Sequence, residues 1–305
     1  KTSKSLMFKQ AFLHRIYKNF PFNLQGQLNK PLPSLQKNFI SCLICTARED
    51  HNLNNLLTDL AQQTLPKHRF EVVVLDNTSK GHNQTILTYQ TSLTLLHIKN
   101  NSRQGLMGDL RNETLEHAKG EFILFLDDDT RLQQKDFLEQ ALNLFQEHNP
   151  DIILPLGQGI PLKTNPNYNF LDNFSFATRC CLYKRSVLEE VNGFQGNITS
   201  YEDIDLGMRL CFKGKTILKS KDISYQHPPV FFNSFNKPLA IAQSLHQLRS
   251  RYPFAIWLLM YGNALRFLPL ILFPTIRNRQ WFKISLAVLI APFIRKKDFS
   301  FLKAT

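Results

Sequence analysis

Short apolar runs that alternate with segments of helical periodicity constrain the fold of this chain more than any other feature. The strand-like runs are residues 39–45, 71–75, 93–98, 121–126 and 151–154, and the helix-like segments are residues 52–63, 106–118 and 134–147. In the first helical segment, leucines at 53, 56, 57 and 60 recur at the spacing of one helix face. Strands that alternate with helices are typical of a parallel, doubly wound sheet, so we predict an α/β fold.

Polar side chains gather where the predicted strands end. They are Thr46, Arg48 and Glu49 after the first strand, Asp76 after the second, and Asp127, Asp128 and Asp129 after the fourth. Ligands of such sheets bind beyond the carboxyl ends of the strands, so we expect these residues to meet in one crevice. No GxGxxG follows the first strand and no GxxxxGK[ST] occurs, which disfavours a Rossmann dehydrogenase or a P-loop enzyme.

Residues 120–130, GEFILFLDDDT, end an apolar strand in three consecutive aspartates. One aspartate after a strand is ordinary, because Asp suits turns and solvent. Three neighbouring carboxylates repel, at roughly 4 kcal/mol for two charges about 4 Å apart and an effective dielectric of ~20. A divalent cation relieves this repulsion and takes carboxylate oxygens as ligands, so we expect a cation site rather than a solvated turn.

The net charge of +13 is confined to the two ends of the chain. Residues 1–38 carry seven Lys or Arg and no acid, and residues 249–305 carry ten and one acid, whereas the residues between carry 20 basic and 23 acidic side chains. A nucleic-acid enzyme more often carries its basic residues on the body that handles the strand. Basic ends on a near-neutral body suit an anionic membrane surface better, so we expect no nucleic-acid partner.

Cysteine usage predicts a reducing compartment. Alternation along the first strand puts Cys42 and Cys45 on opposite faces, a poor geometry for a shared metal, and Cys180 and Cys181 lie in another apolar run. We therefore predict reduced cysteines packed in a core, as in a cytoplasmic protein. Residues 1–38 also lack the continuous apolar stretch of a secretory signal.

Residues 201–214, YEDIDLGMRLCFKG, begin with acids and continue as an amphipathic helix that Gly214 can end. Acids in the first turn of a helix interact favourably with its macrodipole. This accounts for one of Glu202, Asp203 and Asp205 as a structural residue, and a catalytic role stays open for another.

Six segments in this order resemble the large second family of glycosyltransferases, enzymes of GT-A fold that use nucleotide-sugar donors. They are the strand end from Thr46 to Glu49, VVVLDNTS (72–79), NSRQGLMGDLRN (101–112), FLDDD (125–129), CLYKRSVLEEVNGF (181–194) and YEDIDLGMRL (201–210). Each segment alone is a weak signal, but six in the right order are strong. The resemblance covers roughly residues 39–230, and Asn192 stands where the family usually has a second Gly.

The resemblance implies a GT-A type doubly wound mixed sheet, with a Rossmann-like nucleotide-binding half and an acceptor half. It assigns Asp76 to the nucleotide base and Arg111 to the diphosphate or base. The donor-binding residues that it implies are Thr46, Arg48, Glu49, Asp76, Gly105, Arg111, Asp127 and Asp128. It places Mg²⁺ or Mn²⁺ at Asp127 and Asp129, where the ion bridges to the diphosphate.

His227 is a candidate third ligand, because relatives with this fold can carry a metal-ligating histidine in this region. Imidazole is a common ligand, although Mg²⁺ prefers oxygen. A structural histidine held by the two prolines that follow it is the alternative.

The resemblance also implies an inverting reaction with Asp203 as the general base. Asp203 would take the proton of the acceptor hydroxyl while that oxygen attacks the anomeric carbon opposite the leaving diphosphate. The expected donor is a UDP-sugar, and the expected acceptor is a glycan or a lipid-linked molecule of cell-envelope polysaccharide synthesis.

Rival interpretations predict features that the sequence lacks. A nucleotidyltransferase would carry a Gly-rich basic loop after its first strand, unlike TAREDHN (46–52). A non-catalytic membrane-associated sugar- or cation-binding module predicts loss of the base, yet Asp203 is present. A processive polysaccharide synthase would show Gln-x-x-Arg-Trp, of which QLRSRY (247–252) is only a loose echo.

We predict three regions: a basic N-terminal extension (1–38), a GT-A glycosyltransferase domain (39–237) and a membrane-associating helical tail (238–305). Residues 254–273 are long enough to cross a bilayer, but Arg266 near the middle, with Asn263 and Pro269, disfavours a clean span. In-plane or re-entrant helices on the inner face of the membrane fit better. The alternative is that these helices pack on the catalytic body as core.

Overall fold

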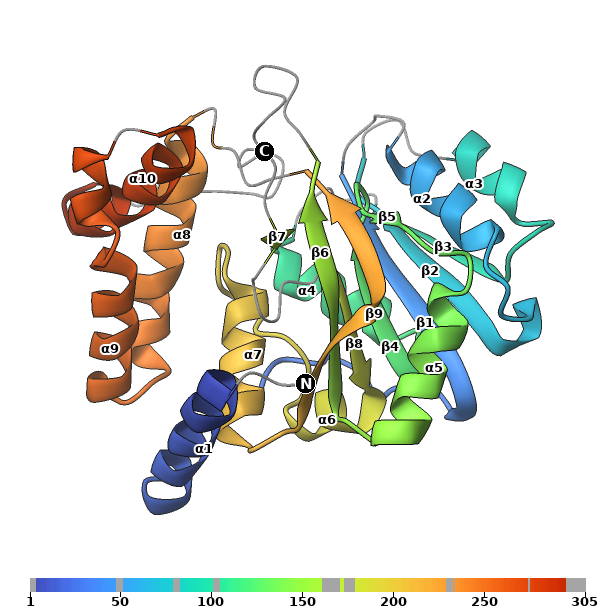
Figure 1. The fold of residues 1–305 in the computed structure, drawn as a ribbon, viewed down its shortest axis with the longest axis horizontal. Helices are drawn as coiled ribbons and strands as arrows, with labels where there is room; N and C mark the ends of the chain where they lie inside the picture. The colour runs from blue at the N-terminus through green and yellow to red at the C-terminus, as the bar shows by residue number, and fades with distance from the viewer. Residues whose placement is uncertain are drawn as a thin grey trace.

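A mixed sheet of nine strands runs through the middle of the molecule, in the order β3-β2-β1-β4-β8-β6-β9-β5 with β7 beside β6 (Figure 1). The computed structural model describes residues 4–47, 52–78, 83–100, 105–160, 171–172, 179–228, 232, 234–273 and 275–294. The strands are β1 (Gln36–Thr46), β2 (Phe70–Asp76), β3 (Leu95–Lys99), β4 (Gly120–Asp127), β5 (Arg131–Leu132), β6 (Ile152–Gly159), β7 (Leu171–Asp172), β8 (Cys180–Lys184) and β9 (Ile217–His227).

The sheet has a parallel half and a mixed half. β1 pairs in parallel with β2 and β4, and β2 pairs in parallel with β3. β8 then lies antiparallel between β4 and β6, and β9 returns parallel to β6. The predicted alternation of strands and helices is confirmed, and the inserted β8 makes the sheet mixed rather than wholly parallel.

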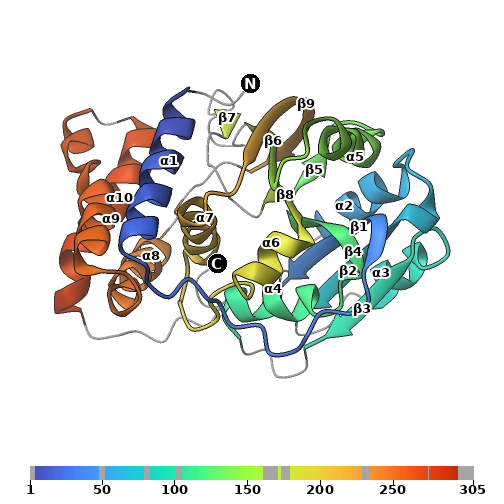
Figure 2. The ribbon, with the colours of Figure 1, turned by 90° about the horizontal axis from the view of Figure 1, so that it is seen from below.

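Helices cover both faces of the sheet (Figure 2). On one face lie α2 (Asn52–Ala61), α3 (Asn83–Tyr89) and α5 (Phe137–His148), and on the other lie α4 (Met107–Leu115), α6 (Arg185–Glu190) and α7 (Glu202–Phe212). Alternation along β1 sends Cys42 and Ile44 into the first core and Leu43 into the second. Because both faces are covered, every residue of β2, which lies between β3 and β1, is buried.

The prediction of unpaired, packed cysteines is confirmed. All five cysteines are free thiols, and four of them are buried while Cys45 is partly exposed. Burial raises the pKa of Cys45 to about 12, although Arg111 acts in the opposite direction. These thiols are therefore protonated packing groups and not nucleophiles.

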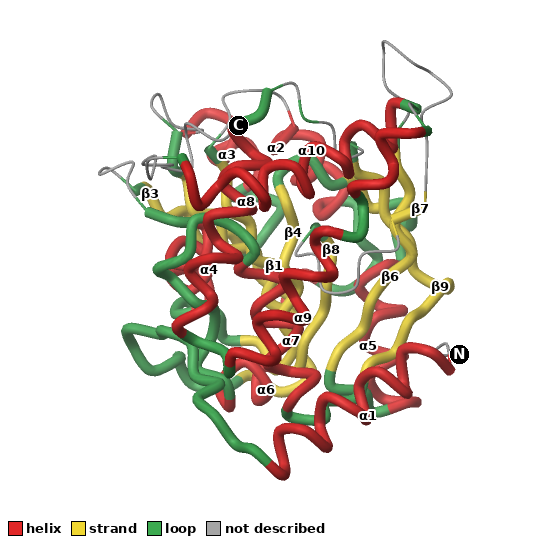
Figure 3. The backbone as a smooth tube through the Cα atoms, turned by 90° about the vertical axis from the view of Figure 1, so that its left-hand side faces the viewer, coloured by secondary structure: helices red, strands yellow, loops and turns green. Residues whose placement is uncertain are grey.

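The two ends of the chain meet on the far side of α7. The helix α1 (Lys4–Asn19) packs on α7 in the region for which the sequence predicts only a basic extension, and residues 20–35 continue as an extended N-terminal strap. The helices α8 (Asn236–Gln247), α9 (Phe254–Leu265) and α10 (Ile276–Ile290), with the 3₁₀ segment η3 (Leu268–Leu272), form a separate layer. Seen from that side, this layer lies in front of the strands (Figure 3).

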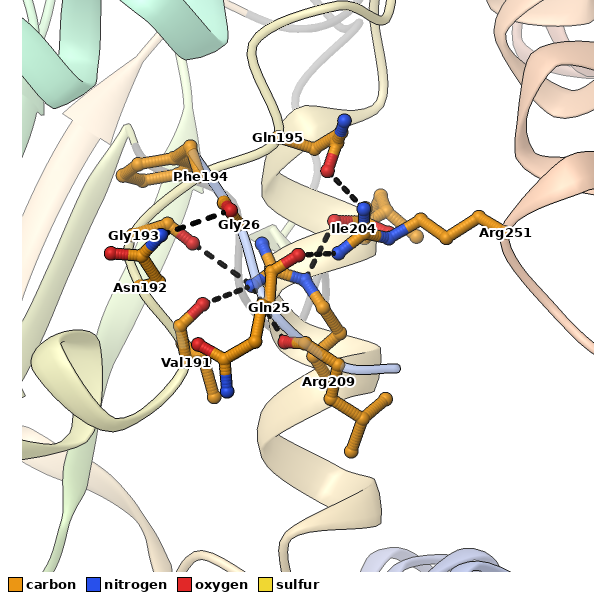
Figure 4. A network of polar contacts seen from close by, with 12 residues as sticks. Gln25, Gly26, Val191, Asn192, Gly193, Phe194, Gln195, Ile204, Arg209 and Arg251 are labelled. Carbon is orange, nitrogen blue, oxygen red and sulfur yellow. Dashed lines mark hydrogen bonds and ion pairs between the residues drawn. The ribbon is translucent and has the colours of Figure 1, made fainter. Parts of the chain in front are cut away.

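A buried arginine joins α7 to the N-terminal strap. Arg209 is 0% exposed, and its Nε donates to Asp205 Oδ2 over 2.8 Å. Its Nη1 donates to the Leu24 carbonyl oxygen over 3.4 Å. It also donates to the carbonyl oxygens of Val191 (3.0 Å) and Gly193 (2.9 Å), as Figure 4 shows. One side chain thus satisfies carbonyls from the strap and from the turn after α6.

The Asp205 carboxylate also connects α7 to the C-terminal helices. Tyr252 donates its hydroxyl proton to Asp205 Oδ1 over 2.8 Å, and Arg251 Nε lies 3.4 Å from that oxygen. Arg251 also donates to the Gln25 carbonyl and the Gln195 side chain (Figure 4). We call Asp205, Arg209, Arg251 and Tyr252 the α7 anchor, because they fix one helix to both ends of the chain.

We expect Arg209→Ala to destabilise the protein by roughly 3–5 kcal/mol, because it removes one partner of a fully buried ion pair. The matched control is Arg131→Ala, which breaks the ion pair with Asp59 from a side chain that is 43% exposed. Because the arginine of this pair is open to solvent, we expect its loss to cost less, on the order of 1 kcal/mol. Urea unfolding measures both, and equal losses would show that the anchor does not hold these segments together.

Candidate active site

The carboxyl ends of β1, β2 and β4 lie side by side. Thr46 is the register partner of Asp76, and Cys45 is the partner of Asp127. The buried Thr46 hydroxyl donates to Asp128 Oδ2 over 2.8 Å. The structure therefore brings together predicted residues from three strand ends, whereas Arg48 and Glu49 lie outside the described residues.

Asp76 is the last residue of β2, and Asn77 follows it. The Asp76 carboxylate is fully buried, accepts hydrogen bonds from the Thr78 backbone (3.0 Å) and hydroxyl (2.6 Å), and lies 3.3 Å from His97 Nε2. Asn77 is 1% exposed, and its side-chain amide has no hydrogen-bond partner in the described part of the chain. Because buried amides are normally paired, Asn77 is a second candidate for a ligand contact beside Asp76. Sequence reasoning missed it, although it follows Asp76 directly.

The start of α4 depends on Gly105. Its φ of +131° is a conformation that side-chain-bearing residues rarely adopt, and an added Cβ would lie 2.9 Å from Leu110. The helix that follows presents Arg111 and Asn112 to different neighbours. Asn112 donates to the Gln27 and Phe194 carbonyls, so it is structural, whereas Arg111 reaches the strand ends.

Arg111 links two parts of the site. Its Nη2 lies 3.2 Å from Asp127 Oδ1, and its Nη1 donates to Glu202 at the start of α7. The guanidinium is buried, and burial alone would lower its pKa. The carboxylates of Glu202, Asp127 and Asp203 instead raise the pKa of Arg111 above its ordinary value, so this cation is permanent.

The three acids at the start of α7 have different partners. Glu202 pairs with Arg111, and Asp205 belongs to the α7 anchor. Asp203 is half-buried, and the hydrogen bond described for its carboxylate comes from the Ile204 backbone at 2.7 Å. Burial and then the Glu202 carboxylate raise the pKa of Asp203 to about 6, against the opposing effect of Arg111. Of the acids left open by the sequence, Asp203 is the one suited to proton transfer.

A short pairing of strands β5 and β9 brings His227 close to Asp127 and Asp129. The two residues of β5, just after Asp129, pair antiparallel with Gln226 and Tyr225 at the end of β9. This places His227 Nε2 2.9 Å from Asp129 Oδ1 and 3.5 Å from Asp127 Oδ2. The ligand atoms of all three side chains lie within 4.8 Å of one another.

The hydrogen bonds of His227 decide what this cluster can hold. Nδ1 lies 2.6 Å from the Pro228 carbonyl oxygen, which only accepts, so Nδ1 carries the proton and Nε2 faces the carboxylates. Burial would lower the pKa of His227, but its bonds to Asp127 and Asp129 raise it to about 9. Burial likewise would raise the pKa of Asp127, but His227 and Arg111 lower it well below its ordinary value. Between Nε2 and the carboxylates there is thus a place for a proton or a metal ion.

The donor set fits a divalent cation. Two carboxylates and an imidazole oriented by a backbone carbonyl are a common ligand set for Mn²⁺, and carboxylates suit Mg²⁺. The predicted metal residues Asp127, Asp129 and His227 therefore lie together, and His227 contacts both these carboxylates and the Pro228 carbonyl.

Comparisons with known proteins agree with this geometry. The model of the family described as glycosyl transferase family 2 matches residues 41–179. The chain is 28% identical over 200 residues to the Staphylococcus aureus poly(ribitol-phosphate) beta-N-acetylglucosaminyltransferase TarS, a match that covers 61% of this chain and 35% of TarS. The chain thus spans about a third of the length of that curated relative.

Two solved structures share the fold. Residues 1–349 of S. aureus TarS in complex with UDP-GlcNAc superpose with a TM-score of 0.57 and 20% identity, over 83% of this chain and 81% of that one. The mannosyltransferase PcManGT from Pyrobaculum calidifontis, in complex with GDP-Man and Mn²⁺, has a TM-score of 0.59 at 15% identity and covers 95% of both chains. The predicted GT-A type fold is confirmed by these likenesses.

We expect Mn²⁺ to bind at Asp127, Asp129 and His227, and Asp129→Ala to weaken this binding. Loss of an outer-sphere partner already costs roughly 10–100-fold in metal affinity, so loss of a ligand should cost at least as much. Asp136→Ala is the control, because Asp136 precedes α5 and is not a member of the cluster. Titration calorimetry with Mn²⁺ alone measures both variants, and comparable affinities would place the metal elsewhere.

Proposed function

Because this chain belongs to the family 2 glycosyltransferases, we propose that it transfers a sugar from a nucleotide diphosphate to a hydroxyl group, with inversion at the anomeric carbon. The observation that carries the proposal is the position of Arg111. It contacts Asp127 in the candidate cation cluster and Glu202, the neighbour of Asp203. The candidate cation cluster, which can hold a diphosphate, and Asp203, which can take a proton, thus lie on either side of Arg111.

The donor would occupy the ends of β1, β2 and β4. Asp76, with Asn77 beside it, would contact the nucleotide base, and Thr46 would support Asp128 near the ribose and diphosphate. Gly105 and Arg111 would adjoin the diphosphate at the start of α4, and Arg48 and Glu49 would complete the donor contacts. The TarS complex with UDP-GlcNAc supports a UDP-sugar as the donor.

The residues Asp127, Asp129 and His227 would hold Mg²⁺ or Mn²⁺. Such an ion supplies Lewis-acid stabilisation of the negative charge on the departing diphosphate. The PcManGT complex with GDP-Man and Mn²⁺ supports this choice of cofactor. The permanent charge of Arg111 would add to the same stabilisation from the α4 side.

Asp203 would act as the general base. As the acceptor oxygen bonds to the anomeric carbon, the bond from that carbon to the diphosphate oxygen breaks, and the acceptor proton moves to the Asp203 carboxylate. A carboxylate with a pKa of about 6 is mostly ionised at neutral pH, yet it is a stronger base than an ordinary aspartate. A positioned base of this kind contributes typically about 10²–10⁴-fold to the rate.

The acceptor would be a glycan or lipid-linked hydroxyl of the cell envelope, reached from the cytoplasmic face of the membrane. The relative TarS is named for a poly(ribitol-phosphate) acceptor, which supports a surface polymer as the substrate class. The uneven charge of the chain supports a membrane location, with residues 39–237 as the catalytic domain and 238–305 as the associating tail.

A panel of nucleotide sugars with Mn²⁺ tests the proposal. A donor at about 100 times its Kd should stabilise the folded protein by roughly 2.7 kcal/mol, which a thermal-shift measurement detects. UDP-sugars should give the largest shifts, and each shift should depend on the metal. The proposal is wrong if no nucleotide sugar changes the melting temperature when Mn²⁺ is present.

We expect Asp203→Asn to bind the donor as the wild type does and to lose roughly 10²-fold or more in turnover. The amide keeps the shape of the side chain but cannot accept the proton of the acceptor. Glu190→Gln is the control, since that carboxylate pairs with lysines remote from the strand ends. Turnover of Asp203→Asn within a few-fold of the wild type would show that another group is the base.

The pH dependence is a second measurement on the same residue. The base works only when ionised, so kcat/KM should fall as the pH drops below about 6, the pKa of Asp203, by about tenfold per pH unit. Asp203→Asn should lose this acid limb. Persistence of the limb in the variant would assign it to a different group.

A further inference from the structure

An apolar surface on the C-terminal helices is exposed. It consists of Phe254, Leu258 and Leu259 of α9 and Ile271, Leu272 and Phe273 at η3, whose exposed fractions run from 51% to 74%. The segment Phe254–Leu272 is long and apolar enough to cross a membrane. Of its most apolar stretch of 18 residues, only 17% is buried inside the protein. This set of residues, the docking face, is therefore not packed as core. Exposed apolar side chains gathered on two neighbouring elements mark an interaction site.

The two sides of α9 differ. Ile256, Trp257 and Ala264 are buried, and the Trp257 indole donates to the Leu245 carbonyl on α8 over 2.8 Å. The opposite side carries Leu258 and Leu259, and a Cβ built on Gly262 there would meet no atom within 4 Å. One side thus attaches α9 to the protein, and the other faces open space.

The charge around the docking face has one sign. The sequence between Asp222 and Asp298 contains ten Lys or Arg and no acid. Arg266, Arg277 and Arg279 are exposed beside the apolar residues of α9 and η3. Apolar side chains bordered by arginines are the composition that helices adopt in the headgroup region of anionic bilayers.

The geometry disfavours a simple span and self-association. α9 ends after 12 residues at Leu265, which at 1.5 Å per residue gives about 18 Å, and only with the 3₁₀ segment η3 does the run Phe254–Leu272 approach the roughly 30 Å of a hydrocarbon core. α10 then packs back against α8 and η3. A twofold contact with a second copy would bring the same arginines together, and these like charges would repel.

We propose that the docking face lies flat in the headgroup region of an anionic lipid bilayer. The layer that carries it adjoins the start of α7, because Tyr201 packs with Trp281 and Ile284 of α10. If the proposed function holds, on which this consequence rests, docking would bring the hydroxyl of a lipid-borne acceptor to the side of the molecule on which Asp203 lies.

Co-sedimentation of the full chain with vesicles tests the docking. The protein should bind vesicles that contain phosphatidylglycerol, bind pure phosphatidylcholine much more weakly, and release as salt screens the charges. The double variant Leu258→Glu/Leu259→Glu should lower the partition coefficient at least about tenfold, because it places charges in the apolar interface. The matched control is Leu87→Glu on α3, a leucine that is 55% exposed on the opposite part of the molecule and should bind as the wild type does.

A second double variant tests the basic border. Arg277→Glu/Arg279→Glu should lower binding to anionic vesicles by at least about fivefold per arginine, since each basic residue near such a surface contributes roughly that factor. It should leave binding to neutral vesicles unchanged. Calorimetry of UDP with Mn²⁺, without vesicles, shows that each variant is folded.

Three results would overturn the docking. They are absence of wild-type binding to anionic vesicles, wild-type binding by Leu258→Glu/Leu259→Glu, and a dimer in solution that this variant dissociates. Failure of the wild type to bind anionic vesicles, while it still binds UDP, contradicts the docking and leaves the proposed function standing. Vesicle binding by a protein that binds no nucleotide contradicts the proposed function and leaves the docking standing.

Discussion

The buried cation Arg111 is the constraint on which the rest of the site depends. Carboxylates from β4 and from α7, which are far apart in the sequence, converge on the Arg111 guanidinium, and their mutual repulsion would otherwise separate them. Arg111 lies between the two groups and contacts one member of each. His227 provides a second positive group on the β4 side, and a metal ion would take over that role. The fold therefore assembles an acid-rich site around a fixed cation, with a place for a second.

The three acids at the start of α7 differ in their contacts, and Arg111 is the first cause of the difference. Glu202 and Asp203 are adjacent on α7, yet Glu202 is committed to the guanidinium while Asp203 is left half-buried with a raised pKa. Asp205, one turn in from the helix start, is used for attachment to both ends of the chain. Three acids in the first turn thus differ in their contacts: Glu202 balances the charge of Arg111, Asp205 anchors the helix, and Asp203 is the proposed base. The macrodipole alone would make them equivalent.

Sequence reasoning located the residues that a general rule places, whereas residues that depend on long-range pairing were reached only through the family resemblance or were missed. Thr46, Asp76 and Asp127 follow parallel strands, and the rule that ligands bind at such ends brings them together. The partner of Asp129 could not be assigned in this way, because His227 reaches it only through the two-residue pairing of β5 with β9. Likewise, nothing local in the sequence shows that Asn77 is buried without a partner or that β8 runs antiparallel.

The start of α7 also depends on the C-terminal helices. Tyr201 adopts a φ of +68°, a left-handed conformation that costs a bulky residue roughly 1–3 kcal/mol and persists only where the surroundings enforce it. Here the surroundings are Trp281 and Ile284 of α10, with Phe232 and Ile241. Because Glu202 and Asp203 follow Tyr201 directly, the packing of α10 sets the position of the candidate base.

The tail predicted to begin at residue 238 is therefore not an independent attachment. Arg251 and Tyr252 enter the α7 anchor, and Trp257 packs with Phe212 of α7 and with Leu24 of the strap, so cutting the chain near Ser250 would open a buried core. The same helices carry the exposed docking face on their opposite side. If a membrane orients these helices, the packing of α10 on Tyr201 would transmit that orientation to Asp203, the residue proposed to take the acceptor proton. Membrane docking and the geometry of catalysis would then share one structural element rather than two joined by a linker.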